Sequence, residues 1–164
     1  MPPGPSAPHG FEFLEKLLDS PGPSGFEVGP ARAWRAEAEG FAHEVWADVT
    51  GNSVAGLNLE GRPRVMLAGH IDEIGLQVTY IDDGGYLFFD EIGGWDSQVL
   101  VGQRVQVLVG KEIIPGVIGK KPIHLLKPEE REKATKTKDL WVDLGCSSAD
   151  EVAELGVRVG DPMV

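Results

Sequence analysis

The fold and the chemistry of this chain are best approached from Val65-Met66-Leu67-Ala68-Gly69-His70-Ile71-Asp72-Glu73-Ile74-Gly75. An apolar run ends at Gly69, and His70 and Asp72 follow it one residue apart. We predict that residues 64–68 form a buried central strand of an α/β sheet, in which ligands bind at the carboxyl ends of strands. Imidazole suits zinc or cobalt, and a nearby carboxylate can fix its tautomer. The stretch therefore predicts one corner of a metal site.

A plainer interpretation of His70 stays open, namely a histidine held by hydrogen bonds in a turn. The glycines on either side favour the functional interpretation, because they specify a tight turn. A catalytic metal needs about three protein ligands, and the other histidines do not complete the set. We expect His9 in a flexible lead, His43 exposed at the start of an outer strand, and His124 in a structural or interface role.

Other polar residues give weaker signals. Glu73 could act as a general base by its chemistry, but in an extended segment it would point away from Asp72. Asp90, Glu91 and Asp96 are interpreted as solvated acids of an acidic chain. No Gly-x-Ser-x-Gly elbow, P-loop or dinucleotide fingerprint is present in the sequence.

Composition excludes several classes of function. The 164 residues are 41% hydrophobic and 25% charged, and 15 Lys and Arg against 26 Asp and Glu give a net charge of −11. Such an acidic chain is not expected to bind nucleic acid or anionic membranes. The single cysteine, Cys146, excludes an internal disulfide and is interpreted as a small buried residue.

The first residues are expected to carry no structure of their own. Residues 1–8 are rich in proline, lack the features of a signal peptide, and are predicted to be a disordered lead. No apolar run approaches the roughly 20 residues that span a bilayer. We therefore expect a cytoplasmic protein.

Residues 9–74 are predicted to be an incomplete α/β domain. Apolar residues at helical spacing predict a helix over 11–19, and Ser24 with Glu27 has the pattern of a capping box for a second helix that ends near Glu39. Pro30 is tolerable only in the first turn, so this helix could begin a few residues after Ser24. Strands are predicted over 43–49, 53–59 and 64–68.

Residues 75–164 are predicted to be a β-rich module, either a small barrel or a sandwich. Glycine turns separate strands over 76–81, 86–90, 104–109, 112–118 and 140–144. Residues 128–138 are predicted to be an exposed turn of helix or loop, and Ser148 with Glu151 to cap a short helix. The glycine-rich segments 92–96 and 114–119 have two open interpretations, turns around a small core or a surface for self-association.

Several motifs occur in a fixed order and together resemble the glutamyl/tetrahedral aminopeptidase family of dinuclear metallopeptidases, some of which carry an endoglucanase label. The resemblance covers the chain from about Phe11 to Val164. The motifs that carry it are Ser24-Gly25-Phe26-Glu27, Asp48-Val49-Thr50-Gly51-Asn52, residues 68–75, Ile92-Gly93-Gly94-Trp95-Asp96, Gly102-Gln103-Arg104-Val105, residues 115–119, Lys121-Pro122-Ile123-His124-Leu125-Leu126, residues 139–145 and Gly160-Asp161-Pro162.

This resemblance implies an α/β catalytic domain with an inserted β-barrel dimerisation domain. It implies that His70 binds one of two zinc or cobalt ions, that Asp72 orients His70, and that the substrate is a peptide. It also implies a homodimer, with a dodecamer as a larger assembly. The family's general base and remaining ligands lie further along the polypeptide, so this chain alone is expected to be inactive. Ile71, Lys120 and Cys146 depart from the usual residues without touching the site.

Two other functions compete with the aminopeptidase. The β-rich module could act without catalysis, as a self-association domain. A glycosidase would need two opposed carboxylates roughly 5–9.5 Å apart, and nothing in the sequence singles out such a pair. The glycosidase is therefore disfavoured.

Overall fold

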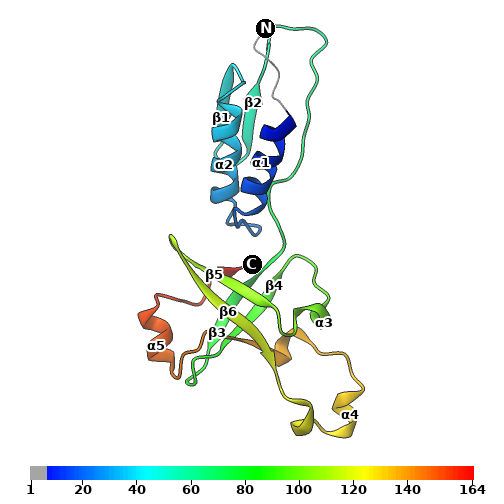
Figure 1. Cartoon of the computed structure of the whole chain (residues 1–164), viewed down its shortest axis with the longest axis vertical. Coiled ribbons are helices and arrows are strands. Elements are labelled where there is room, and N and C mark those ends of the chain that lie inside the picture. Colours follow the sequence, from blue (N-terminus) through cyan, green and yellow to red (C-terminus); the bar gives the residue numbers. More distant parts are fainter. Residues whose placement is uncertain (1–6) are drawn as a thin grey trace. The chain divides into compact units, whose positions relative to one another are not determined.

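The computed structural model describes residues 7–164, which form two compact units that divide between Glu73 and Ile74 (Figure 1). Most of the predicted disordered lead lies outside the described residues. Residues 7 and 8, which were assigned to that lead, instead begin helix α1 (Ala7–Leu18). Proline is compatible with the first turn of a helix, because the backbone N–H that it lacks has no partner there.

The first unit contains two helices and a β-hairpin. After α1 come α2 (Val28–Ala38), β1 (Glu44–Ala47) and β2 (Ser53–Gly56), and the two strands pair antiparallel from Glu44–Gly56 to Ala47–Ser53. The Asp48 carboxylate organises the turn between them by accepting hydrogen bonds from the N–H of Thr50 and Asn52 and from both of their side chains. These bonds lower the pKa of Asp48 to about 2. The break between the strands predicted over 43–49 and 53–59 is thus a turn.

The capping box predicted at Ser24 is wrong. Helix α2 has Glu27 at its N-cap without a side-chain capping bond, and Pro30 lies in its first turn. The Glu27 carboxylate accepts a hydrogen bond from the Gly25 N–H at 2.7 Å, while the Ser24 hydroxyl donates to the Asp72 carboxylate. A capping hydroxyl would accept a hydrogen bond from a helix N–H, whereas the Ser24 hydroxyl donates to an ionised carboxylate, which makes a stronger hydrogen bond. Ser24 therefore contacts a segment distant in sequence.

The buried strand predicted over residues 64–68 is also wrong. This segment is extended but belongs to no sheet, and Val65, Met66 and Leu67 are 78%, 87% and 94% exposed. A strand needs a neighbour to satisfy its backbone groups. Among residues 7–73, β1 and β2 pair only with each other, so nothing covers the segment.

The second unit is a closed antiparallel barrel of six strands (Figure 1), which confirms a barrel rather than a sandwich. The order around the barrel is β3-β4-β7-β6-β5-β8. The strands are β3 (Gly75–Ile81), β4 (Leu87–Ile92), β5 (Arg104–Val109), β6 (Glu112–Lys120), β7 (Leu140–Asp143) and β8 (Pro162–Met163). The two-residue strand β8, which the sequence did not predict, pairs with both β3 and β5 and closes the barrel.

Alternation along the strands builds the core of the barrel. Every second residue points inward, so pairs such as Leu87 and Phe89 or Val105 and Val107 are buried while their neighbours face outward. Full burial of one such side chain contributes about 1.5–3 kcal/mol. The buried cluster comprises Leu76, Val78, Leu87, Phe89, Leu100, Val105, Val107, Ile118, Leu140, Val142, Val152, Val157 and Met163.

Short helices connect the barrel strands. They are α3 (Ser97–Leu100), η1 (Ile123–Leu125), α4 (Pro128–Arg131), η2 (Thr137–Asp139) and α5 (Ala149–Glu154). Asp96, interpreted from sequence as solvated, caps α3 by accepting a hydrogen bond from the Gln98 N–H. Ser148 caps α5 as predicted, through the Glu151 N–H. The exposed turn predicted over 128–138 is confirmed, and no helix in residues 7–164 is long and apolar enough to cross a membrane.

Candidate metal centre

His70 and Asp72 lie close together at the end of the exposed extended segment of the first unit. The His70 Nδ1 is 3.0 Å from the Asp72 Oδ1 and 3.0 Å from the Asp72 carbonyl oxygen. The imidazole is 86% exposed and the Asp72 side chain is 36% exposed. Both acceptors lie at Nδ1, so Nδ1 carries the proton and Nε2 keeps its lone pair.

Ser24 holds the other side of the Asp72 carboxylate. Its hydroxyl donates a hydrogen bond to Oδ2, and this bond, followed by that from His70, lowers the pKa of Asp72. The carboxylate is therefore ionised at neutral pH and favours a proton on the His70 Nδ1. Ser24, Asp72 and His70 form a relay of contacts that fixes the orientation of the ring.

The sequence did not identify this role of Ser24. The contact depends on the pairing of residues 22–24 with residues 72–73, in which Pro23 bridges Glu73 and the Ser24 N–H donates to the Glu73 carbonyl. No local pattern reveals a pairing between segments almost fifty positions apart. The local pattern of Ser24 and Glu27 instead predicts a helix cap.

Glu73 has a structural contact rather than a free carboxylate. Its Oε1 accepts a hydrogen bond from the Gly22 N–H at 2.9 Å, and its own N–H donates to the Gly22 carbonyl at 3.1 Å. The side chain thus fixes the loop that precedes α2. This contact disfavours Glu73 as a general base.

The other histidines lie in separate places. His9 is part of α1, and His43 accepts a hydrogen bond at Nδ1 from the Asn58 N–H at 3.0 Å. His124 is exposed on η1, in the barrel unit. In the described part of the chain, no three His, Cys, Asp or Glu side chains gather closely enough to bind a metal ion. His70 fits the role of one ligand, and residues 7–164 do not supply a complete set.

Cys146 packs against the barrel core and is partly buried. Burial raises the pKa of its thiol, and the carboxylates of Glu151 and Asp143 raise it further. The thiol is therefore neutral near pH 7 and a poor nucleophile or metal ligand. The sequence predicts a small buried residue, and the structure places Cys146 only partly buried.

Known proteins are similar to this chain over almost all of its length, including the segment with His70 and Asp72. Lysyl aminopeptidase of Pyrococcus furiosus is 36% identical over 154 residues, which cover 92% of this chain and 44% of the relative. A TET aminopeptidase from a marine-sediment Thaumarchaeota archaeon superimposes with a TM-score of 0.86 at 42% identity, over 95% of this chain and 44% of that one. The TET1 peptidase of Pyrococcus horikoshii, which can assemble into a tetrahedron or an octahedral shell, gives 0.82 at 38% identity over 94% and 46%.

The chain thus spans less than half the length of each of these relatives. The sequence model of the M42 glutamyl aminopeptidase family matches residues 51–164, which include the His70–Asp72 pair and the whole barrel. The family predicted from the ordered motifs is confirmed: this chain belongs to the M42 glutamyl aminopeptidases.

Proposed function

We propose that these residues are the N-terminal portion of a metal-dependent aminopeptidase, which releases N-terminal residues from peptides. His70 would bind one of two zinc or cobalt ions through Nε2. Two such ions would lower the pKa of a shared water and polarise the scissile carbonyl. The observation that supports this proposal best is the exposed imidazole, whose Nδ1 contacts Asp72 while Nε2 has no hydrogen-bond partner among residues 7–164.

Asp72 acts in this proposal as a positioning residue. Its carboxylate holds the proton on the His70 Nδ1 and fixes the plane of the ring, and Ser24 holds the carboxylate in turn. Outer partners of this kind change metal affinity by about 10–100-fold when they are removed. We expect Asp72→Asn to weaken metal binding of the full-length protein by that factor in a titration with zinc, while an unchanged circular dichroism spectrum shows that the variant is folded.

The test is aminopeptidase activity of a protein extended to the full length of the relatives. Leucine, glutamate and lysine p-nitroanilides with zinc or cobalt would report the activity and the preferred residue. His70→Ala should abolish hydrolysis, whereas His124→Ala, which removes an exposed histidine of the barrel, should not. Full activity of His70→Ala would refute the proposed ligand.

We propose further that residues 1–164 alone are inactive, because the described residues offer only one ligand. Incubation of the pure chain with peptides and cobalt should release no amino acids. Robust cobalt-dependent release would contradict this proposal. Incubation of the same chain with a β-glucan tests the disfavoured glycosidase, and we expect it to release no reducing sugar.

Self-association of the barrel unit is the second candidate function. Along β6, Ile113 and Val117 face outward, 49% and 46% exposed, with the exposed Pro115 between them. An apolar row on a sheet face favours burial against a partner, and we propose a second copy of this chain. Homodimers, and dodecamers built from them, would follow the assemblies of the TET peptidases. A strictly monomeric mass at tens of micromolar by analytical ultracentrifugation would overturn this proposal.

A further inference from the structure

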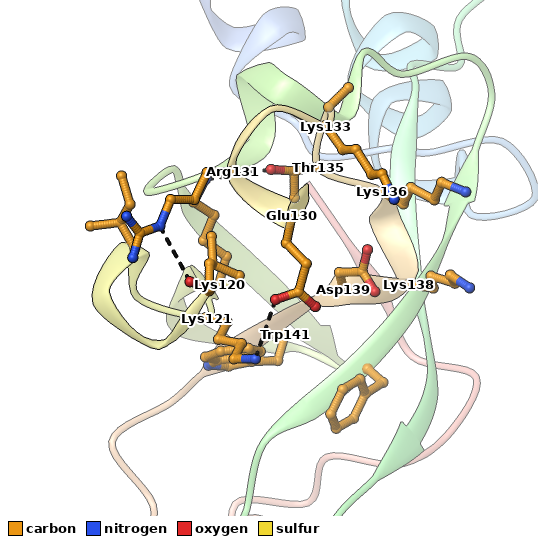
Figure 2. A pocket seen from close by; sticks show the side chains of 14 residues that line it. Lys120, Lys121, Glu130, Arg131, Lys133, Thr135, Lys136, Lys138, Asp139 and Trp141 are labelled. Carbon is orange, nitrogen blue, oxygen red and sulfur yellow. Dashed lines mark hydrogen bonds and ion pairs between the residues drawn. The ribbon is translucent and has the colours of Figure 1, made fainter. Parts of the chain in front are cut away.

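A basic hollow lies on the barrel unit, outside the barrel core and within residues 88–141 (Figure 2). It has a volume of about 580 Å³. Its walls come from β4, the end of β6, the connecting segment with η1, α4 and η2, and the start of β7. The aminopeptidase chemistry proposed above uses none of these residues.

The charge of this hollow is opposite to that of the molecule. The basic residues that line it are Lys120, Lys121, Arg131, Lys133, Lys136 and Lys138, against the acidic Glu130 and Asp139. These six account for more than a third of the 15 Lys and Arg in a chain with a net charge of −11. A concave surface with one sign of charge concentrates ligands of the opposite sign.

Three of the six basic side chains form neither a hydrogen bond nor an ion pair within residues 7–164. Figure 2 shows the Glu130 carboxylate beside Lys121, with an N–O distance of 3.8 Å. The Arg131 Nε donates to the Leu126 carbonyl at 3.2 Å. The amines of the lysines at positions 133, 136 and 138 have no carboxylate within ion-pair distance in residues 7–164. They are therefore available to an anionic ligand.

The same hollow has an apolar side. Phe88, Ile123, Leu126 and Trp141 line it together with the charged residues. The Trp141 ring is held edge-on against Tyr86, with ring centroids 5.8 Å apart. An aromatic surface next to lysine amines suits a ligand that combines an apolar side chain with carboxylates.

Contacts with the barrel hold the wall that carries the free lysines. The Ser97 hydroxyl donates to the Thr135 carbonyl at 2.5 Å, and the Thr137 hydroxyl donates to the Glu91 carboxylate. The Lys120 amine reaches the Thr135 hydroxyl at 3.4 Å. These contacts tie Thr135 and Thr137 to the barrel, so this part of the wall needs no ligand to hold it, which lowers the entropic cost of binding.

We propose that this basic hollow binds a short acidic peptide segment. Its carboxylates pair with Lys133, Lys136 and Lys138, and an apolar side chain beside them packs on Phe88 and Trp141. A nucleic acid fits the observations less well, because its chain of phosphates needs an extended basic face and the rest of this molecule is acidic. The proposal does not depend on the metal chemistry of His70.

Fluorescence anisotropy with the full chain tests this proposal. The probe is fluorescein-labelled Glu-Phe-Glu-Glu, and the matched probe is Gln-Phe-Gln-Gln. The hollow variant combines Lys133→Gln, Lys136→Gln and Lys138→Gln. The control variant combines Lys16→Gln, Lys111→Gln and Arg158→Gln, which are outside the hollow and give the same net charge.

We expect the acidic peptide to bind, and the hollow variant to weaken it at least tenfold while the control variant changes Kd less than twofold. Binding should weaken as salt rises from 50 to 300 mM, because the amines are exposed. Amide chemical shifts should change within residues 88–141. Thermal unfolding verifies each fold, and the single Lys136→Gln substitution gives a smaller loss if the triple variant unfolds.

Four outcomes would overturn the proposal. They are equal binding of the glutamine peptide, equal losses in the two triple variants, shift changes confined to other residues, and tighter binding of a single-stranded oligonucleotide of equal charge. The last outcome would replace the peptide by a nucleic acid. Loss of peptide binding in the hollow variant only would support the proposal even if the aminopeptidase assay failed.

Discussion

The two units of this chain differ in how much of their apolar surface and sheet edge each covers with its own residues. The barrel unit closes its sheet and buries thirteen apolar side chains in one cluster. Among residues 10–73 only the small side chains of Pro23, Pro30, Ala31 and Ala38 are buried, while Phe11 and Leu18 on α1 are each 71% exposed. The barrel has its own core, and the first unit presents apolar surface that its own described residues do not cover. The barrel unit therefore has the core of an independent domain, and the described part of the first unit does not.

The largest effect that would test this contrast is the loss of a core side chain. Leu87 is fully buried in the barrel, and Leu67 is 94% exposed in the first unit. We expect Leu87→Ala to lower the free energy of unfolding by about 2–5 kcal/mol, and Leu67→Ala to change it by less than about 0.5 kcal/mol. Urea unfolding measures both, and similar losses would break the contrast.

A crowded glycine gives a somewhat smaller effect. A Cβ on Gly116 would lie 2.5 Å from the Val142 Cγ1 and 2.9 Å from the Leu144 Cδ2, whereas a Cβ on Gly94 would meet nothing within 4 Å. Overpacking a core costs about 1–3 kcal/mol, so we expect Gly116→Ala to unfold at lower urea than Gly94→Ala. Equal midpoints would show that the barrel wall yields more easily than its packing suggests.

Helix caps allow a finer comparison between the units. Ser148 caps α5 in the barrel unit, whereas Glu27 begins α2 without a capping bond. Ser148→Ala should destabilise the barrel unit by about 1 kcal/mol, and Ser147→Ala, beside it on the surface, is the control. Glu27→Ala should change stability less than Ser148→Ala. Thermal unfolding followed by circular dichroism distinguishes these cases.

The smallest expected effect lies in the hairpin of the first unit. The pKa of Asp48 is about 2, against an ordinary value of 3.8. Because the pKa is lowered on folding, the stabilisation is present above pH 4 and is lost as pH falls toward 2. An NMR titration should place the midpoint near 2, and Asp48→Asn should remove this acid-dependent loss. Asp19→Asn is the control, and a midpoint near 3.8 would contradict the turn geometry.

The features that could be predicted from the sequence are those that depend on residues close together in the chain. The five longer barrel strands could be predicted because apolar residues alternate with others along each strand, and because glycines mark the turns between the strands. Strand β8 has only two residues and no readable period, so its role in closing the barrel could not be predicted. Whether residues 64–68 pair in a sheet depends on neighbouring strands, and no local sequence pattern reveals these.

The same distinction applies to the candidate metal centre. His70 and Asp72 are one residue apart, so their contact could be predicted from spacing and residue type. Ser24 reaches Asp72 only through the pairing of two distant segments, and its local pattern indicated a helix cap instead. The basic hollow was missed for a related reason, because it combines lysines of one connecting segment with aromatic residues of β4 and β7.

The closure of the barrel by β8 has a consequence for biosynthesis. Leu76 on the first strand pairs with Met163 on the last, so the barrel cannot close until the ribosome has released residue 163. At about 5–20 residues per second, the first strand waits about 4–17 seconds for its partner. During that interval one edge of β3 and the apolar face of the nascent sheet are open to pairing with other chains.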